Sequence, residues 1–289
     1  MPDLLARDGT RLAYRVTGQG RPVVCLPGGP MLEPGYLGDL GGLSGTRRLV
    51  LPDYRGTGRS QTPDDIASCR CDRLVDDVEA LRQHLGLDRM VLLAHSGGAD
   101  LATLYAARYP ERIDSLVMVT PSTMAVGIAA AAEVRREVVR RRRDEPWFEQ
   151  VSAAFEAIAA GRAVATDWEA VVPFTYGRWD AAARAHREDM DRRRNPRAAA
   201  AFAAEGAFDQ EATRAALATV DRPVLVLAGE LDLAAPPPLL ADYAALFPNA
   251  TFFTQPGAGH YPWVDDPDRF ADAVTAFLGH SADLGRPDL

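Results

Sequence analysis

The stretch Val-Leu-Leu-Ala-His-Ser-Gly-Gly-Ala, residues 91–99, decides the fold. An apolar run stops at Ser96, and a helix-forming pattern begins after it. We interpret this as a buried strand, a sharp turn and a helix, with the serine in a strained conformation that puts its hydroxyl at the carboxyl edge of a sheet. Ala94 and Gly98 are small because strand and helix pass closely there. Ala94 stands where glycine is usual, so the pentapeptide alone also fits an ordinary strand-to-helix turn.

Two later loops supply the partners that a serine needs to become a nucleophile. An apolar run over residues 223–228 predicts a strand that ends near Gly229, and Asp232 follows it. A last strand over residues 250–254 is followed by a glycine-rich loop with His260. Loops at the carboxyl ends of parallel strands meet at one edge, and the order serine, acid, histidine suits this type of elbow. The sequence therefore predicts a catalytic triad of Ser96, Asp232 and His260, although a loop aspartate alone is more often a turn residue.

The choice of histidine rests on position, because the chain has five. His84 and His186 fall in helical patterns and are expected on solvated faces, and His280 lies in the C-terminal tail. His95 adjoins the serine, but a neighbour on a sharp turn points away from it. His260 combines a late position, a preceding strand and a glycine-lined loop.

A second glycine-rich loop follows the apolar run at residues 22–26. Acyl transfer needs two backbone N–H donors for the oxyanion, one after the nucleophile and one from an earlier loop. We expect Gly97 to supply the first and Gly29 the second. Gly28 is the alternative donor and a candidate for substrate contact. A plain Gly-Pro turn is the alternative structure.

Several motifs together carry a resemblance to a known family. The chain resembles the α/β-hydrolase family, and within it the proline iminopeptidase-like branch, from about Leu4 to Leu278. The motifs are Leu-Pro-Gly-Gly-Pro (26–30), Asp-Tyr-Arg-Gly-Thr-Gly-Arg-Ser (53–60), Ala-His-Ser-Gly-Gly (94–98), Gly-Glu-Leu-Asp (229–232) and Gly-Ala-Gly-His (257–260). The chain departs from the iminopeptidases at Pro27, Met31, Tyr54 and Gly97, where they carry His, Gly, Gln and Trp. The resemblance implies the family's fold and triad.

Composition bounds the class of protein. At 289 residues, with 47% hydrophobic and 25% charged residues, the chain suits one globular catalytic domain with an inserted subdomain. The net charge of −8, in which all 32 basic residues are arginine, argues against a nucleic-acid partner. We expect a cytoplasmic monomer or small homo-oligomer without membrane association, since neither an apolar leader nor an 18-residue apolar span occurs. Cys25, Cys69 and Cys71 suit plain thiols, and we expect no metal and no cofactor.

Alternating strand and helix patterns predict an α/β-hydrolase fold, with a mostly parallel sheet of about eight strands flanked by helices and opened by an antiparallel hairpin. Between residues 124 and 217 the strand patterns stop, and this Ala- and Arg-rich segment predicts an all-helical cap above the catalytic edge. The core then comprises residues 1–123 and 218–289. Within the cap, Arg140–Arg143 could form a phosphate or nucleic-acid patch, but acids stand close by in the sequence, so a solvated face is expected; these acids are Glu133, Glu137, Asp144 and Glu145.

These features predict a serine hydrolase that acts on a small molecule or a short peptide. The leading hypothesis is an aminopeptidase or amidase that releases an N-terminal amino acid. The alternative is a carboxylesterase, lactonase or thioesterase for an apolar acyl group, and a third is a ligand-binding receptor built on this fold. An aminopeptidase needs a carboxylate for the substrate's ammonium group, and the iminopeptidase resemblance implies that it lies in the cap. Glu205, between two phenylalanines, is the first candidate and Asp209 the second, with helix capping or a salt bridge as the alternative role.

Overall fold

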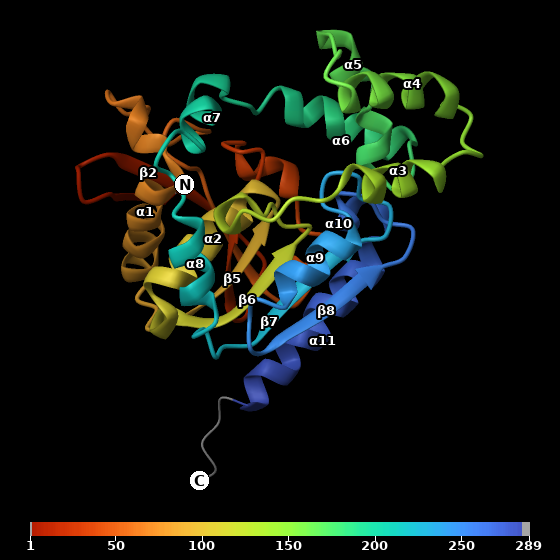
Figure 1. Ribbon diagram of the computed structural model, residues 1–289. Helices are drawn as coiled ribbons and strands as arrows, with labels where there is room; N and C mark the ends of the chain where they lie inside the picture. The colour runs from red at the N-terminus through yellow and green to blue at the C-terminus, as the bar shows by residue number, and fades with distance from the viewer. Residues whose placement is uncertain (1, 285–289) are drawn as a thin grey trace.

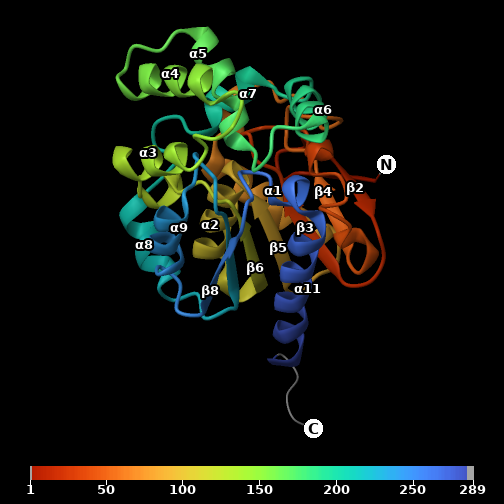
Figure 2. The same ribbon diagram turned by 90° about the vertical axis from the view of Figure 1, so that its right-hand side faces the viewer.

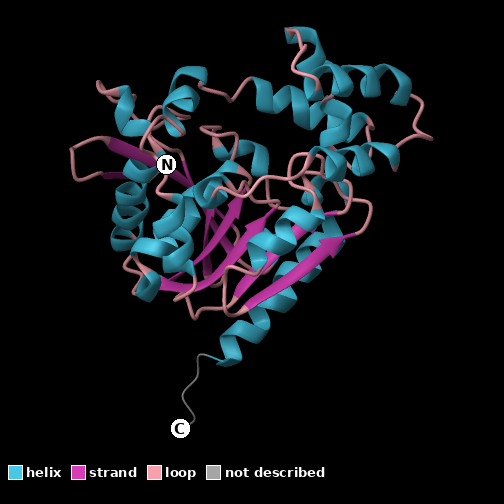
Figure 3. Ribbon diagram, viewed as in Figure 1, coloured by secondary structure: helices cyan, strands magenta, loops and turns pink. Residues whose placement is uncertain are grey.

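Eight strands form a single sheet in the computed structural model, which describes residues 2–284. The strands are β1 (Asp3–Leu5), β2 (Arg11–Thr17), β3 (Pro22–Leu26), β4 (Arg48–Pro52), β5 (Met90–His95), β6 (Ile113–Val119), β7 (Val224–Gly229) and β8 (Ala250–Gln255). Their order is β1-β2-β4-β3-β5-β6-β7-β8, in which β3 to β8 run parallel and β1 and β2 are antiparallel to their neighbours. The predicted α/β-hydrolase sheet is confirmed, and Figure 3 shows it in magenta between the helices.

Helices cover both faces of the sheet because the central strands are apolar on both sides. The flanking helices are α1 (Cys71–His84), α2 (Gly97–Arg108), α8 (Gln210–Leu217), α9 (Pro237–Ala244) and α11 (Pro267–Leu284). Successive strand residues point to opposite faces, so Val24 and Leu92 pack with α1, α2, α8 and α9, while Val23 and Leu93 pack with α11. Figure 2 shows α11 on one side of the sheet and α2, α8 and α9 on the other.

The strand order places a topological switch point beside the nucleophile loop. From β3 the chain moves to β4 on one side, and it then crosses to β5 on the other side. Leu26 at the end of β3 pairs with Ala94 of β5, so the loops that follow these two strands begin side by side. Such a crevice at the carboxyl ends of parallel strands is where ligands bind in open α/β sheets.

Helices inserted between β6 and β7 lie above this edge of the sheet (Figure 1). They are α3 (Ala132–Arg140), α4 (Phe148–Ala159), α5 (Ala165–Ala170), α6 (Ala181–Asp191) and α7 (Pro196–Phe202), and the short α10 (Pro262–Asp265) follows β8. The segment is helical as predicted. The overlying part of the segment ends before the predicted residue 217, because α8 packs along α2 on one face of the sheet and not above its edge. The overlying helices therefore end with α7.

Two side chains of this segment depart from the surface positions that we predicted, whereas Arg140, Arg141 and Arg143 are exposed as expected. Arg142 is only 3% exposed, because its guanidinium donates to the Tyr176 carbonyl at 2.7 Å and lies over the Trp147 ring at 4.9 Å. His186 is half-buried, with hydrogen bonds to the Tyr176 hydroxyl and the Tyr36 carbonyl. Both side chains pack inward, where aromatic rings and a carbonyl replace the water that we expected around them. No helix within the described residues combines the length and apolar character needed to span a bilayer.

Candidate active site

Ser96 sits on the sharp turn between β5 and α2. Its backbone angles are φ 50° and ψ −122°, a left-handed conformation that non-glycine residues rarely adopt. Its N–H donates to the Val119 carbonyl at 3.1 Å, which ties the turn to β6. A Cβ on Gly98 would lie 2.5 Å from the carbonyl oxygens of Leu26 and Pro27. The close passage of strand and helix therefore requires glycine at position 98, as the sequence predicts.

The structure brings the three predicted triad residues into one hydrogen-bonded chain. The His260 Nε2 atom lies 2.9 Å from the Ser96 Oγ atom, and His260 Nδ1 lies 2.8 Å from Asp232 Oδ2. Asp232 is fully buried, and its other carboxylate oxygen accepts the N–H groups of Ala234 at 2.8 Å and Ala235 at 3.1 Å. These two donors fix the carboxylate in the orientation that meets the histidine.

The two glycines of the earlier loop have different surroundings. The Gly28 N–H is buried and donates to the Tyr36 hydroxyl at 2.6 Å. The Gly29 N–H has no acceptor among the described residues, and Gly29 lines a cavity with Ser96. Gly97 is the first residue of α2, and the first N–H groups of a helix have no partner within it. Gly29 and Gly97 thus leave N–H donors free beside the serine, whereas the Gly28 N–H is already bonded to Tyr36.

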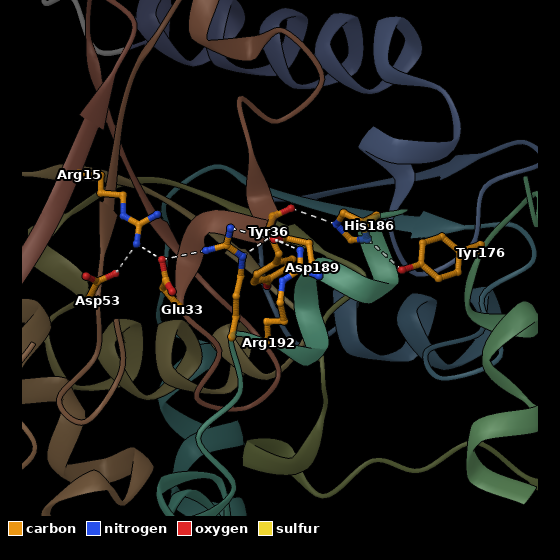
Figure 4. A network of polar contacts seen from close by, with 9 residues as sticks. Arg15, Glu33, Tyr36, Asp53, Tyr176, His186, Asp189 and Arg192 are labelled. Carbon is orange, nitrogen blue, oxygen red and sulfur yellow. Dashed lines mark hydrogen bonds and ion pairs between the residues drawn. The ribbon is translucent and has the colours of Figure 1, made fainter. Parts of the chain in front are cut away.

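A buried polar network joins the glycine loop to the histidine loop. The Tyr36 hydroxyl lies 2.8 Å from His95 Nδ1, and His95 Nε2 lies 3.0 Å from the His260 carbonyl. The Thr120 hydroxyl donates to the same carbonyl at 2.9 Å. Tyr36 and His95 are 3% and 1% exposed. Figure 4 shows the continuation of this network, in which the Tyr36 carbonyl meets His186 of α6 and His186 meets Tyr176.

The environment fixes the protonation of this network. Burial and the nearby His260 lower the pKa of His95 well below its usual value, so its imidazole is neutral. Burial raises the pKa of Tyr36 well above its usual value, and the hydroxyl keeps its proton. Tyr36 therefore accepts from Gly28 and donates to His95 Nδ1, which leaves His95 Nε2–H to donate to the carbonyl of His260.

Two cavities meet at Ser96 and His260, since both residues line each of them. The first, which we call the arginine chamber, has a volume of about 120 Å³. It is also lined by Gly29, Leu32, His95, Arg187, Met190, Asp191, Arg194 and Tyr261. The second, the large chamber, has a volume of about 340 Å³. Its other lining residues are Pro121, Ser122, Thr123, Met124, Ile128, Ala129, Arg135, Ala234, Ala235 and Leu239.

The predicted ammonium-binding acids lie outside both chambers. Glu205 is exposed, and its backbone carbonyl accepts from Arg70 at 3.0 Å. Phe202 and Phe208 on either side do pack inward, but the intervening turn directs Glu205 to solvent. Asp209 caps α8 by accepting the Ala212 N–H at 3.0 Å. The alternative reading of these acids, a capping or surface role, is therefore the one that fits.

The chamber side chains that we did not predict come from α6 and from the histidine loop. Arg187 and Arg194 belong to an arginine-rich segment in which the sequence does not distinguish one arginine from another. Tyr261 adjoins His260 in the sequence, and this adjacency is the signal that points to it. Within residues 2–284, no group of three or more histidine, cysteine or acidic side chains is placed to hold a metal ion, and the three cysteines are buried thiols.

Comparison with known proteins gives partial matches to curated relatives. One is a cis-3-alkyl-4-alkyloxetan-2-one decarboxylase of Shewanella oneidensis, 38% identical over 116 residues, which cover 39% of this chain and 36% of the relative. Another is a proline iminopeptidase of Heyndrickxia coagulans, 36% identical over 108 residues, covering 37% of this chain and 38% of the relative. The matches thus span less than half the length of each of these relatives.

A similar solved structure and a family match extend over nearly the whole fold. A proline iminopeptidase of Mycobacterium smegmatis superposes with a TM-score of 0.74 at 22% identity, covering 99% of this chain and 100% of the other. Residues 21–267 match the family described by the alpha/beta hydrolase fold. That range includes the elbow, both glycine donors, the aspartate and the histidine. The chain therefore belongs to the α/β hydrolase fold family.

Proposed function

We propose that this protein is a serine hydrolase that cleaves a carboxylic ester, lactones included, through an acyl-enzyme. The observation that carries the proposal is the chain of two hydrogen bonds from Asp232 through His260 to Ser96, at 2.8 and 2.9 Å. It ends at the junction of two cavities. A serine hydroxyl in contact with an oriented imidazole is the arrangement that activates it as a nucleophile.

The first half of the reaction forms the acyl-enzyme. Ser96 Oγ attacks the carbonyl carbon of the substrate while its proton moves to His260 Nε2. The negative charge that develops on the carbonyl oxygen is held by the N–H groups of Gly29 and Gly97. Asp232 stabilises the imidazolium through Nδ1. Collapse of this intermediate breaks the bond to the leaving oxygen, which takes the proton from His260 as it departs.

The second half releases the acid and restores the serine. Water attacks the acyl carbon and gives its proton to His260 Nε2, again with the oxyanion on the two glycine donors. Collapse breaks the bond to Ser96 Oγ, which recovers the proton from His260. No further group is needed for the balance of atoms, because water supplies both the hydroxyl of the acid and the proton returned to the serine.

The walls of the chambers favour an ester over a substrate with a free α-amine. Burying an ammonium group near the carbonyl requires an available carboxylate. Asp191 is the one carboxylate that lines either chamber among the described residues, and it is 2.9 Å from the Arg187 guanidinium. An oxetan-2-one is a cyclic ester, so the decarboxylase relative is named for a substrate with the bond proposed here.

Labelling with a fluorophosphonate tests the nucleophile. The intact mass of the wild type should rise by one adduct, and Ser96→Ala should neither gain the adduct nor hydrolyse p-nitrophenyl butyrate above about 10⁻⁴ of the wild-type rate. Ser152→Ala changes a serine on α4 that lines neither chamber, and it should behave as wild type. Labelling and turnover in Ser96→Ala equal to wild type would reject the assignment. Labelling of the wild type without turnover of any ester or anilide would favour a receptor.

An aminopeptidase is the second candidate, and the proline iminopeptidase relatives favour it. It is separated from the esterase by matched substrates. An aminopeptidase should hydrolyse proline p-nitroanilide and lose this activity when the proline nitrogen is acetylated. An esterase should hydrolyse simple p-nitrophenyl esters and neither anilide. Hydrolysis of the free-amine anilide alone indicates an aminopeptidase, and hydrolysis of the esters alone indicates an esterase.

A further inference from the structure

Two arginines from the helical cap lie beside the reacting serine. Arg187 and Arg194 line the same small chamber as Ser96 and His260. The chain as a whole has a net charge of −8, so a local excess of positive charge next to the nucleophile is not a general property of its surface. Arginine is the side chain whose planar donors best match a carboxylate.

Backbone contacts hold Arg194 against the glycine loop. Arg194 forms an isolated β-bridge with Leu32, which also lines the chamber. The neighbouring residues are anchored to the core, since Arg193 donates to Glu33 at 2.9 Å and Asn195 donates to the Gly56 carbonyl at 2.6 Å. Figure 4 shows Glu33 between Arg15 of β2 and the side chains that follow α6. The backbone of Arg194 is therefore fixed from both sides, while its side chain is exposed.

The guanidinium of Arg194 has no carboxylate partner, unlike those of its neighbours. Arg192 and Arg193 both bind Asp189, at 3.1 and 2.5 Å. Among the described residues, no carboxylate lies within 4.0 Å of Arg194, and no hydrogen bond joins its side chain to another residue. A free guanidinium on the wall of a cavity is available to a ligand.

The charges in the arginine chamber leave one positive charge unbalanced. Arg187 is paired with Asp191 at 2.9 Å, so the two arginines and one aspartate sum to a single positive charge. Tyr261 adds a hydroxyl that forms no hydrogen bond within the described residues, on a residue that is only 7% exposed. Burial raises the pKa of Tyr261, the charges of Asp232 and Asp191 add to this rise, and those of Arg187 and Arg194 act in the opposite direction.

We propose that the ester substrate carries a carboxylate, which Arg194 binds in the arginine chamber with Arg187 and the Tyr261 hydroxyl as further donors. This inference rests on the serine hydrolase function proposed above and names its substrate class. One unbalanced positive charge matches the single charge of a carboxylate, whereas a phosphate monoester would bring about two. The 120 Å³ chamber suits a short carboxylate arm.

The opposite half of the substrate lies in the large chamber. Most of its lining is apolar, including Met124, Ile128 and Leu239. Its one arginine, Arg135, donates to the Ala130 carbonyl at 2.9 Å. The substrate is thus an ester with a short anionic arm on one side of the scissile carbonyl and an apolar group on the other. Such a molecule places its carbonyl at Ser96, where the chambers meet.

Pairs of esters that differ only in charge test this recognition. Monomethyl succinate has its carboxylate in the acyl half, and methyl 4-oxopentanoate replaces that carboxylate by an acetyl group. Acetoxyacetate and acetoxyacetone form the matching pair for the alcohol half. In pH-stat titrations the wild type should prefer the anionic member of at least one pair by about 10- to 100-fold in kcat/KM, the range for hydrogen bonds to a charged group.

Variants locate the preference at Arg194. Arg194→Ala should reduce the preference by about tenfold, through both a higher KM and a lower kcat, and Arg194→Lys should restore part of it. Arg192→Ala is the matched control, because that exposed arginine lines neither chamber. It should keep the full preference. Equal rates on both members of both pairs, or an Arg194→Ala variant with unchanged preference, would overturn the carboxylate site and leave the serine hydrolase intact.

Calorimetric titration of Ser96→Ala with monomethyl succinate gives a readout that needs no turnover. Binding that is weakened about tenfold in the Ser96→Ala, Arg194→Ala double variant supports the carboxylate site even where the wild type hydrolyses no ester. In that case the proposed reaction fails while the recognition stands. The absence of monomethyl succinate binding to Ser96→Ala, together with charge-independent hydrolysis by the wild type, is the opposite result and rejects the recognition alone.

Discussion

Removal of the Tyr36 hydroxyl should destabilise the fold and slow catalysis, because one oxygen serves two buried partners. In Tyr36→Phe the Gly28 N–H and the His95 Nδ1 atom both lose the group that they contact at 2.6 and 2.8 Å. Each buried polar group left without a partner costs about 1–3 kcal/mol. The variant should therefore lose about 2–6 kcal/mol in the free energy of unfolding.

The same change should act on the reaction through the glycine loop. Gly28 precedes the proposed oxyanion donor Gly29, and its bond to Tyr36 fixes the backbone there. A shift of that backbone misaligns the donor, and a misplacement of about 1 Å can cost up to about 100-fold in rate. We expect kcat for p-nitrophenyl butyrate to fall while KM changes little, because Tyr36 lines neither chamber.

Urea unfolding and steady-state kinetics measure both effects, and a second tyrosine is the control. The Tyr14 hydroxyl contacts His84 Nε2 at 3.1 Å, but His84 is exposed, so water can replace that bond. Tyr14→Phe should stay within about 0.5 kcal/mol of wild type. A Tyr36→Phe variant as stable and as active as Tyr14→Phe would refute the network as a positioning device.

Three further outcomes follow from the geometry of the site. Asp232→Asn should fold but lower kcat by about 10⁴-fold, because the amide favours the wrong tautomer of His260; near-normal turnover would point to another acid. Burial raises the pKa of Asp100 from 3.8 to about 6. The protonated side chain therefore contributes fully to the free energy of unfolding below about pH 4, and this contribution is lost as the pH rises through 6. In urea unfolding, Asp100→Asn should therefore gain up to about 3 kcal/mol over wild type at pH 8 and little at pH 4, whereas an equal gain at both would exclude titration. Gly98→Ala should lower the free energy of unfolding by about 1–3 kcal/mol or more, since its Cβ would meet carbonyl oxygens at 2.5 Å; unchanged urea unfolding would contradict the close passage.

The sheet was predictable because the sequence repeats one simple pattern along it. Each buried strand is a short apolar run that ends in small or polar residues, and parallel strands bring all such ends to one edge. The predicted strands at residues 223–228 and 250–254 lie within one residue of the bounds of β7 and β8. Ser96, Asp232 and His260 could be placed together on that basis alone, without knowledge of any contact.

The cap was predictable as helix but not in its orientation. Helices α3 and α6 are amphipathic, but their sequences do not show which of their many arginines and other polar side chains find buried partners. Glu205 follows α7 on a turn that only the packing of Phe202 and Phe208 orients, and His186 faces inward because Tyr36 and Tyr176 offer it partners. Such long-range partners leave no local signal in the sequence.

Direct contacts join the glycine loop to the cap, and we expect them to link substrate choice to catalysis. The backbone that carries Gly29 continues to Leu32, which bridges Arg194, and then to Glu33, which binds Arg193. A substrate anion that binds Arg194 therefore binds a residue that is bridged to the loop with the oxyanion donor. Binding energy from the anionic arm can in this way be expressed at the reacting carbonyl, where it lowers the barrier instead of only tightening the ground state. Loss of the arm should then lower kcat as well as raise KM for the ester.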